Sequence, residues 1–434
     1  MNKRSGDRSA TVLFAFFWFA YSATYIGRLN YSACMPAIMA ELHLSKAFAG
    51  AVGTGFLAFY AVGQLLNGLI GDKISPKYMI GAGLFGAGTA NLFMGFNTFV
   101  PLMPVIWCFN GYCSAMLWSP LIRAISEWLP QHRQTRAGVG IASTIPAGTI
   151  ASYLSSALIL RLAGWRAVFL FSGGFLILAS AVWAAGMAGL RKYIAAACAQ
   201  SEADRNARRE QAAAAGRKET LRSALKLFVG SGLAFAAFGI LFNGVLKDGV
   251  TLWVPAFLKE YFGVSPAFAS VLSVALPVAS VFGAYLSVGL NKRFFDNEFT
   301  TSAVMFLISA VSFTLLILLG VKNIYAAVLM IAASSTAMLG LNTMFLTFIP
   351  LYFKQLGKSA TVTGFLNACS YAASSVSSVT IGVLAARGGW NATILSWVCI
   401  AAAGLLICVA GRKRWAENRG LISRGIEEEN PQTV

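Results

Sequence analysis

Charged residues are scarce in this chain of 434 residues. Asp, Glu, Lys and Arg together make up 12% of it, and hydrophobic residues make up 57%. Because roughly a quarter of the residues in soluble domains are charged, this scarcity excludes a set of ordinary soluble domains. The polar residues stand in short groups between apolar runs, and these runs reach the roughly 20 residues that a helix needs to cross a bilayer. The composition therefore predicts an all-α integral membrane protein.

Residues suited to metal binding, disulfide bonding or catalysis are few as well. The chain has two histidines, His43 and His132, both in predicted loops, so we expect no histidine-based metal centre. Its seven cysteines show no paired spacing of the kind that marks a disulfide framework or a metal site. No nucleophile–base pair or phosphate-binding loop is visible. The sequence therefore predicts neither an enzyme nor a resident cofactor or metal.

Basic residues are concentrated between the apolar runs. The net charge is +18, and Lys and Arg outnumber Asp and Glu in the segment 191–226 and in the connections 72–77 and 123–136. Since cytoplasmic loops of membrane proteins are rich in Lys and Arg, we expect both termini and the central segment in the cytoplasm. The pattern predicts a protein of the plasma membrane (the inner membrane of a bacterium), in contact with the lipid bilayer and not with nucleic acid.

Twelve apolar runs are predicted to cross the membrane. The first begins near Thr11 and lacks a small-residue cleavage site, so we interpret it as a retained helix and not as a signal peptide. The spans are expected near residues 11–38, 48–71, 77–98, 101–128, 136–163, 165–190, 227–258, 265–290, 300–320, 323–350, 359–386 and 390–411.

The two halves of the chain repeat each other weakly. The segment LSKAFAGAV at 44–52 aligns with VSPAFASVL at 264–272, and Gly164-Trp165 aligns with Gly389-Trp390. Six predicted spans separate the partners, and an even number inserts both halves in the same orientation. Secondary transporters with such parallel repeats bind substrate between the repeats, near the midplane. We therefore predict two six-helix bundles related by a parallel pseudo-two-fold axis, at 1–190 and 227–411, with a cytoplasmic linker at 191–226 and a cytoplasmic tail at 412–434.

Three charged residues lie well inside predicted spans: Arg28 in the first, and Lys247 and Asp248 in the seventh. An arginine in the middle of a membrane helix costs about 2.5–3.5 kcal/mol on insertion scales, so it usually faces a polar cavity or a partner. Arginine offers a planar fork of donors and lysine a compact charge, so together they are suited to bind an anion. The alternative is a structural triad in which Asp248 neutralises one base. One positive charge then remains, which an anionic substrate would neutralise.

Asp248 directly follows Lys247. Side chains one residue apart do not face each other on a regular helix, so we do not expect these two to pair. A proton-carrying role and a role in helix packing are both left open for Asp248. Gly249 and Pro255 predict a kinked or loosened seventh helix at this point, which backbone that lines a cavity tolerates.

Further candidates lie near these charges and near the expected cytoplasmic ends of spans 2 to 5. Most aromatic residues in membrane spans serve packing or the interface, so each aromatic candidate competes with that role. Charged residues at the cytoplasmic ends are suited to salt bridges that lock one conformation, but ordinary loop charge explains them equally well. The binding-site candidates are Asn30, Tyr60, Gln64, Trp253 and Tyr371, and the gate candidates are Asp72, Lys73, Arg123, Glu127 and Arg136.

Four motifs are distinctive in combination. They are Tyr25-x-x-Arg28-x-Asn30, the charged turn 68–77, Trp118-Ser-Pro-x-x-Arg123, and the stretch KDGVTLWVP at 247–255. The turn is typical of the major facilitator superfamily. With the other motifs, the chain resembles the organophosphate:phosphate antiporter family over essentially all twelve spans. The resemblance implies the major facilitator fold, a monomer, and binding of the substrate phosphate by Arg28 and Lys247.

The leading hypothesis is a secondary active transporter that exchanges a sugar phosphate or another organophosphate for inorganic phosphate by alternating access. Gln64 and Ala147 stand where the glycerol-phosphate carriers of the resembled family have a lysine and a histidine, which leaves a different phosphate ester or a carboxylate open. One alternative is a proton-coupled symporter of carboxylates or sugar acids, with Asp248 as the coupling group. The other is a transporter-like anion sensor, a role that some members of the resembled family have.

Overall fold

The computed structural model describes residues 3–71, 74–199, 232–319, 322–353 and 359–424. Every regular element in these ranges is a helix, and none is a strand. In a bilayer, the backbone groups of a spanning segment must find hydrogen-bond partners within the protein, which an α-helix provides along its own length. The described chain is therefore all-α, as its composition predicts.

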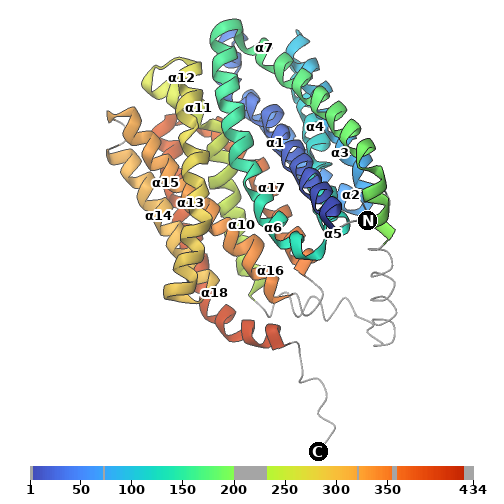
Figure 1. Ribbon diagram of the computed structural model, residues 1–434. Helices are drawn as coiled ribbons and strands as arrows, with labels where there is room; N and C mark the ends of the chain where they lie inside the picture. Colours follow the sequence, from blue (N-terminus) through green and yellow to red (C-terminus); the bar gives the residue numbers. More distant parts are fainter. Residues whose placement is uncertain (1–2, 72–73, 200–231, 320–321, 354–358, 425–434) are drawn as a thin grey trace, which may run out of the picture. The chain divides into compact units, whose positions relative to one another are not determined.

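Eleven helical runs in the described ranges are long and apolar enough to cross a membrane. One of them, α7 (Thr144–Gly189), is 46 residues long and contains Gly164 at a φ of +79°. This backbone conformation favours glycine and interrupts a right-handed helix, so α7 consists of two helices that meet at Gly164 (Figure 1). Dividing α7 there confirms the twelve predicted spans. The repeat partner Gly389 has a φ of +74°, and the last helix, α18 (Gly389–Arg424), begins at it.

The chain divides into two compact units. Unit 1 consists of Met1–Ala37 and Ala58–Thr220, and unit 2 consists of Ile38–Leu57 and Leu221–Val434. The predicted linker 191–226 lies mostly outside the described residues, so its boundaries stay predictions. The helices of the first half are α1 (Lys3–Glu41), α2 (Lys46–Gly71), α3 (Pro76–Phe96), the short 3-10 turn η1 (Val100–Leu102), α4 (Met103–Ala115), α5 (Trp118–Trp128), α6 (Gln131–Ala142) and α7.

The described part of the second half contains three π-helical turns, η2, η3 and η5, between or after α-helices. Its elements are α10 (Leu233–Gly244), η2 (Val245–Gly249), α11 (Val250–Phe262), α12 (Pro266–Ser273), α13 (Ala275–Leu290), η3 (Asn291–Phe295), α14 (Glu298–Leu318), α15 (Ile324–Thr343), η5 (Met344–Phe348), α16 (Ile349–Tyr352), α17 (Ser359–Arg387) and α18.

The beginning of α2 belongs to unit 2 because it packs against α17. The Thr54 hydroxyl donates to the Ser375 carbonyl at 2.8 Å, and the Ser378 hydroxyl donates to the Gly50 carbonyl at 2.8 Å. These side-chain to backbone bonds fix the two helices at close range. The compact units therefore do not coincide with the two halves of the sequence.

Glycines allow the backbones of neighbouring helices to touch in each unit. In unit 1, a Cβ on Gly173 of α7 would lie 2.8 Å from the carbonyl oxygen of Gly88 on α3. In unit 2, a Cβ on Gly340 of α15 would lie 2.7 Å from the carbonyl oxygen of Gly283 on α13. Membrane helices associate through van der Waals packing, which small residues at the interface improve. A larger residue at these positions would push the helices apart.

Aromatic side chains fill the interior of unit 1. Phe17 of α1 lies between Trp128 and Trp183, with ring centres 6.0 Å away in each case. All three side chains are buried. Because these rings come from α1, α5 and α7, they fix the position of α1, the helix that contains Arg28.

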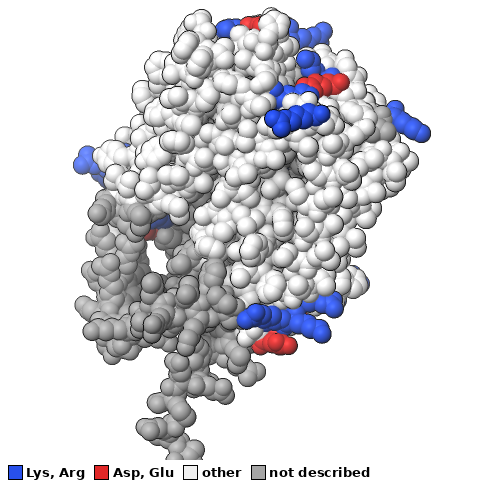
Figure 2. Space-filling view, turned by 180° about the vertical axis from the view of Figure 1, so that it is seen from behind, with Lys and Arg blue, Asp and Glu red and all other residues white. Residues whose placement is uncertain are grey.

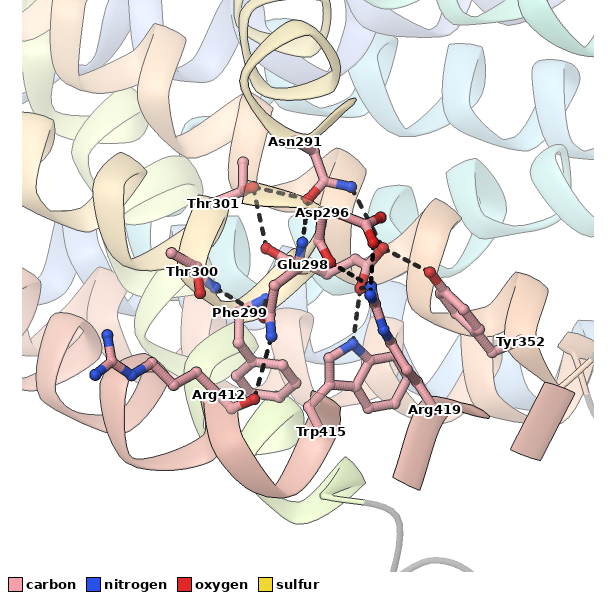
Figure 3. A network of polar contacts seen from close by, with 11 residues as sticks. Asn291, Asp296, Glu298, Phe299, Thr300, Thr301, Tyr352, Arg412, Trp415 and Arg419 are labelled. Carbon is pink, nitrogen blue, oxygen red and sulfur yellow. Dashed lines mark hydrogen bonds and ion pairs between the residues drawn. The ribbon is translucent and has the colours of Figure 1, made fainter. Parts of the chain in front are cut away.

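The last helix continues past the predicted end of its span at 411. Its extension is anchored on Glu298, which is 1% exposed and is the first residue of α14 (Figure 3). The Trp415 indole donates to the Glu298 carboxylate at 2.7 Å, and the Tyr352 hydroxyl donates to it at 3.0 Å. Arg419 forms an ion pair with Asp296 at 2.7 Å. The first part of the predicted tail is therefore a helix that packs against the rest of unit 2.

Charged side chains avoid most of the surface seen in Figure 2. Lys, Arg, Asp and Glu gather mainly at two ends of that face, and a broad band of uncharged residues separates them. Large apolar side chains are exposed in both units, among them Phe96, Leu162 and Tyr285, which are 71%, 74% and 74% exposed. Apolar surface of this extent marks contact with a membrane. The protein is an integral membrane protein.

Candidate functional site

Arg28 of α1 lies against two tyrosine rings. Its guanidinium carbon is 4.4 Å from the centre of the Tyr60 ring and 4.8 Å from the centre of the Tyr25 ring. Both tyrosines are buried, whereas Arg28 is partly exposed. A cation within about 6 Å of an aromatic face is stabilised by the ring quadrupole, by about 2 kcal/mol where water is excluded. A neutral ring stabilises the arginine without cancelling its charge, so the side chain keeps its attraction for an anion.

Tyr60 is held in place by hydrogen bonds within unit 1. The Gln64 amide donates to the Tyr60 hydroxyl at 2.9 Å, and the Ser119 hydroxyl donates to the Gln64 side-chain carbonyl at 3.2 Å. Gln64 follows Tyr60 by about one turn of α2, which places both on one face of that helix. Two predicted binding-site residues are thus brought together with Arg28. Ser119, which we did not predict, joins them from α5.

Three buried asparagines surround the backbone just before Arg28. The amides of Asn91 and Asn110 donate to the Gly27 carbonyl at 3.1 and 2.8 Å, and the Asn30 amide donates to Asn91 at 2.7 Å. All three side chains are 0% exposed. The structure therefore places the binding-site candidate Asn30 in the interior of unit 1, against α3. Asn91 and Asn110 were not predicted, although a strongly polar residue in an apolar span is itself a signal.

We expect Asn91→Leu to destabilise unit 1. The change removes a donor to Gly27 and the acceptor of Asn30, and a buried polar group left without a partner costs about 1–3 kcal/mol. Thermal unfolding in detergent measures the loss. Thr89→Val is the matched control, because the Thr89 hydroxyl on the same helix donates to the Phe85 carbonyl one turn before it. Equal effects of the two substitutions would contradict a special role for the asparagines.

Lys247 and Asp248 form an ion pair in unit 2. Lys247 Nζ lies 2.9 Å from Asp248 Oδ1, and the two side chains are 24% and 25% exposed. Our expectation that these neighbours do not pair was wrong, because η2 is a π-helical turn. Successive residues are separated by a smaller angle around a π-helix than around an α-helix, and such turns often occur at functional sites. The loosening predicted near Gly249 is this turn.

Asp248 also contacts α17. Its Oδ2 atom lies 2.9 Å from the Ser374 hydroxyl, and the same hydroxyl lies 2.8 Å from the Ser370 carbonyl and 3.0 Å from the Gly244 carbonyl. A Cβ on Gly244 would lie 3.0 Å from Ser374 Oγ and would collide with the Ser370 carbonyl. Glycine at this position therefore lets α10 and η2 approach α17 closely enough for the contact with Asp248.

The two aromatic candidates of unit 2 differ in their surroundings. The centre of the Tyr371 ring is 5.9 Å from Lys247 Nζ, near the outer limit of a cation–π contact, and Tyr371 is partly exposed. Trp253 is 0% exposed, and its indole donates to the Ser378 carbonyl at 2.9 Å. Tyr371 thus lies beside the ion pair, whereas Trp253 packs in the interior of unit 2.

Part of the predicted gate can be located. Arg123 Nε donates to Glu127 Oε1 at 2.8 Å across one turn of α5, and an Arg123 NH group donates to the Ile74 carbonyl at 3.3 Å. Asp72 and Lys73 lie outside the described residues. Arg136 lies in α6, but its side chain is also outside the described part of the structure. The hydrogen bond from Arg123 to Ile74 therefore connects α5 to the segment after α2.

Another ion pair lies in unit 2, at the beginning of α2. Lys46 Nζ lies 2.7 Å from Glu260 Oε2, and the Trp390 indole donates to the same oxygen at 2.8 Å. Lys46 also donates to the Ala385 carbonyl at 3.4 Å. These four residues come from α2, α11, α18 and α17. We did not predict the cluster, because Lys46 and Glu260 lie just outside the predicted spans.

We expect Lys46→Glu to lower the melting temperature of the protein, because it places two acidic groups together at this cluster. The pair is about a quarter exposed, so the free energy of unfolding should fall by about 1 kcal/mol. The double change Lys46→Glu/Glu260→Lys restores an ion pair and should recover part of the loss. Recovery should be incomplete, because the Trp390 indole then lacks its acceptor. Lys259→Glu makes the same charge change at the residue before Glu260 and serves as the control. No recovery in the double variant would contradict the pair.

Among the described residues, no group of three or more His, Cys, Asp or Glu side chains is arranged to hold a metal ion. Arg28 and Lys247 are the two basic residues among the binding-site candidates, each with its own neighbours.

Comparison with known families assigns the chain. The model of the Major Facilitator Superfamily matches residues 17–378, well over half of the sequence. This chain belongs to the Major Facilitator Superfamily. Membership confirms the fold expected from the repeat and the motifs. It also makes the protein a membrane transporter and not an enzyme.

Relatives of this facilitator-superfamily protein include carriers of phosphate esters. A probable hexose phosphate transport protein of Chlamydia muridarum is 25% identical over 297 residues, 64% of this chain and 63% of that protein. The glycerol-3-phosphate transporter of Bacillus subtilis is 23% identical over 302 residues, 66% of each chain. The D-galactonate transporter of Escherichia coli is 27% identical over 161 residues, 37% of each chain. Each match spans less than two thirds of the relative, and the first two confirm the resemblance to organophosphate carriers.

Solved transporters share the fold. A bacterial homologue of the human lysosomal transporter Spinster, in an inward-facing and unoccupied conformation, aligns with a TM-score of 0.68 and 15% sequence identity. The alignment covers 96% of this chain and 97% of that one. At this level of identity, the likeness concerns the fold alone.

Proposed function

We propose that this facilitator-superfamily protein exchanges a phosphate ester, such as a sugar phosphate, for inorganic phosphate by alternating access. The observation that carries the proposal is one partly exposed basic residue inside a spanning helix of each unit: Arg28 beside two tyrosines, and Lys247 beside Asp248. A charge at the centre of a membrane helix costs about 2.5–3.5 kcal/mol, which argues for a functional reason. The similarity to hexose-phosphate and glycerol-3-phosphate carriers supports this substrate class.

The chemistry of phosphate suits these two residues. A guanidinium group donates two parallel N–H bonds to two phosphate oxygens, and an ammonium group adds a compact charge. Inorganic phosphate and phosphate monoesters present the same terminal oxygens, so one set of ligands serves both anions in turn. We infer that Arg28 and Lys247 bind the phosphoryl group, with Tyr60, Gln64 and Tyr371 as their neighbours.

We also propose that the protein lies in the inner membrane of a bacterium as a monomer, with both termini in the cytoplasm. The basic connections support this orientation, as do the exposed residues Arg412, Lys413 and Arg414 in the extension of α18. In this orientation the Arg123–Glu127 pair lies on the cytoplasmic side. There it would act with Asp72, Lys73 and Arg136 as a gate that breaks and reforms during transport.

A proton-coupled symporter of a carboxylate or sugar acid is the second candidate. The observation that favours it is the Asp248 carboxylate, which is 25% exposed beside Lys247. A carboxylate in this position can take up a proton when an anion replaces it on the lysine. The similarity to a D-galactonate transporter supports this candidate. That match covers a shorter part of the chain than the matches to the phosphate-ester carriers do.

Exchange of inorganic phosphate in reconstituted vesicles tests the proposal. Vesicles loaded with phosphate should take up labelled phosphate, and uptake should stop when internal phosphate is omitted. A hexose phosphate and glycerol 3-phosphate added outside should compete with the label. Uptake that requires an imposed proton gradient and ignores internal phosphate would identify the symporter instead. Phosphate binding without any exchange would indicate a sensor.

A further inference from the structure

We propose that Asp248 is an internal counter-anion that competes with the substrate for Lys247 and so lowers the affinity of the site. Without substrate, its carboxylate occupies Lys247, and an incoming anion must displace it. The inference rests on the proposed role of Lys247 in phosphate binding. It adds a residue that weakens anion binding at Lys247, so that a bound anion can be released again.

The backbone fixes Asp248 beside Lys247. The Lys247 carbonyl accepts a hydrogen bond from the Thr251 hydroxyl at 2.6 Å, which ties the turn η2 to α11. A Cβ on Gly249 would collide with Ser377 Oγ of α17, so the glycine lets η2 rest directly on that helix. Helix packing, and not a flexible loop, therefore determines that the carboxylate meets the ammonium group at 2.9 Å.

The second contact of Asp248 can be exchanged at low cost. The Ser374 hydroxyl has a single proton to donate, and three acceptors lie within reach: Asp248 Oδ2 at 2.9 Å, the Ser370 carbonyl at 2.8 Å and the Gly244 carbonyl at 3.0 Å. When Asp248 turns away, the hydroxyl can donate to a carbonyl instead. The Asp248 side chain is 25% exposed, so water can reach its oxygens. The carboxylate can thus leave Lys247 without stranding a buried polar group.

Displacing the carboxylate costs the same free energy whichever anion takes its place. A singly charged anion replaces one carboxylate contact by an equivalent one, and a dianion at the same distance is attracted to the lysine about twice as strongly. The displaced carboxylate moves toward water, where its repulsion is screened. The pair therefore lowers the affinity for every anion by about the same factor.

Binding to the purified protein in detergent tests the inference, with inorganic phosphate and singly charged gluconate as probes. At about pH 8, above the second pKa of a phosphate group, Asp248→Asn should bind phosphate about five- to tenfold more tightly, because a partly exposed ion pair no longer competes. Gluconate should gain a similar factor, because the cost of displacing the carboxylate is common to both anions. Asp248→Ala removes the same competitor and should give the same result if the asparagine variant does not fold.

Asp296→Asn is the matched control. It also removes one negative charge from unit 2, at an 84% exposed side chain that pairs with Arg419, and it should leave both affinities unchanged. Phosphate affinity that is unchanged or weaker in both Asp248 variants, with binding still lost in Lys247→Ala, would overturn the counter-anion and leave the proposed function standing. If neither Lys247→Ala nor Arg28→Ala changes phosphate binding, the proposed function fails together with the inference.

Discussion

We expect Arg28→Ala to lower phosphate exchange in reconstituted vesicles by at least about 100-fold. The change removes the guanidinium that Tyr25 and Tyr60 hold at 4.8 and 4.4 Å. A charge-assisted hydrogen bond contributes about 1.5–3 kcal/mol, and a guanidinium forms two with one phosphate group. Since each 1.4 kcal/mol is a factor of ten, the loss of both bonds accounts for a change of this size.

Two further variants separate charge from geometry at this position. Arg28→Lys keeps the charge but not the planar fork, so we expect a loss of about tenfold, as one charge-assisted bond would give. Tyr60→Phe keeps the ring over Arg28 and removes only the hydroxyl bonded to Gln64, so exchange should change by no more than a few fold. Full exchange in a folded Arg28→Ala protein would remove Arg28 from the binding site.

We expect Lys247→Ala to abolish exchange and to destabilise the protein at the same time. The change removes a proposed phosphate ligand and leaves Asp248 without its ion-pair partner. The two side chains are 24% and 25% exposed, so the loss should lie between that of an exposed pair and that of a buried pair, at about 1–2 kcal/mol. Thermal unfolding in detergent and vesicle exchange measure the two effects separately.

The double variant Lys247→Ala/Asp248→Asn distinguishes a ligand from a structural ion pair. Stability should return, because the carboxylate no longer lacks a cation, whereas exchange should stay lost, because no basic ligand is restored. Exchange that returns together with stability would show that Lys247 serves only to neutralise Asp248. A double variant as unstable as Lys247→Ala alone would show that the pair does not stabilise the protein.

The number and approximate limits of the spans follow from the sequence because hydropathy is a local property. Each spanning helix satisfies its own backbone, so an apolar run of sufficient length is recognisable without knowledge of its neighbours. The break at Gly164 was predictable for a similar reason: the same Gly-Trp pair begins a span at Gly389, and both glycines have a positive φ. The continuation of α18 beyond 411 was not predictable, since the residue that anchors it, Glu298, lies far away in the sequence.

The sequence by itself determined the all-α membrane architecture, the superfamily resemblance, and Arg28, Lys247 and Asp248 as the charges inside the spans. Only the tertiary structure decided what surrounds each charge. The Tyr60 ring on Arg28, the asparagines on the Gly27 carbonyl and the serine on Asp248 come from other helices, and no local pattern records which helices pack together. The pairing of Lys247 with Asp248 depends on a π turn that packing against α17 accommodates, which the rule for regular helices does not anticipate.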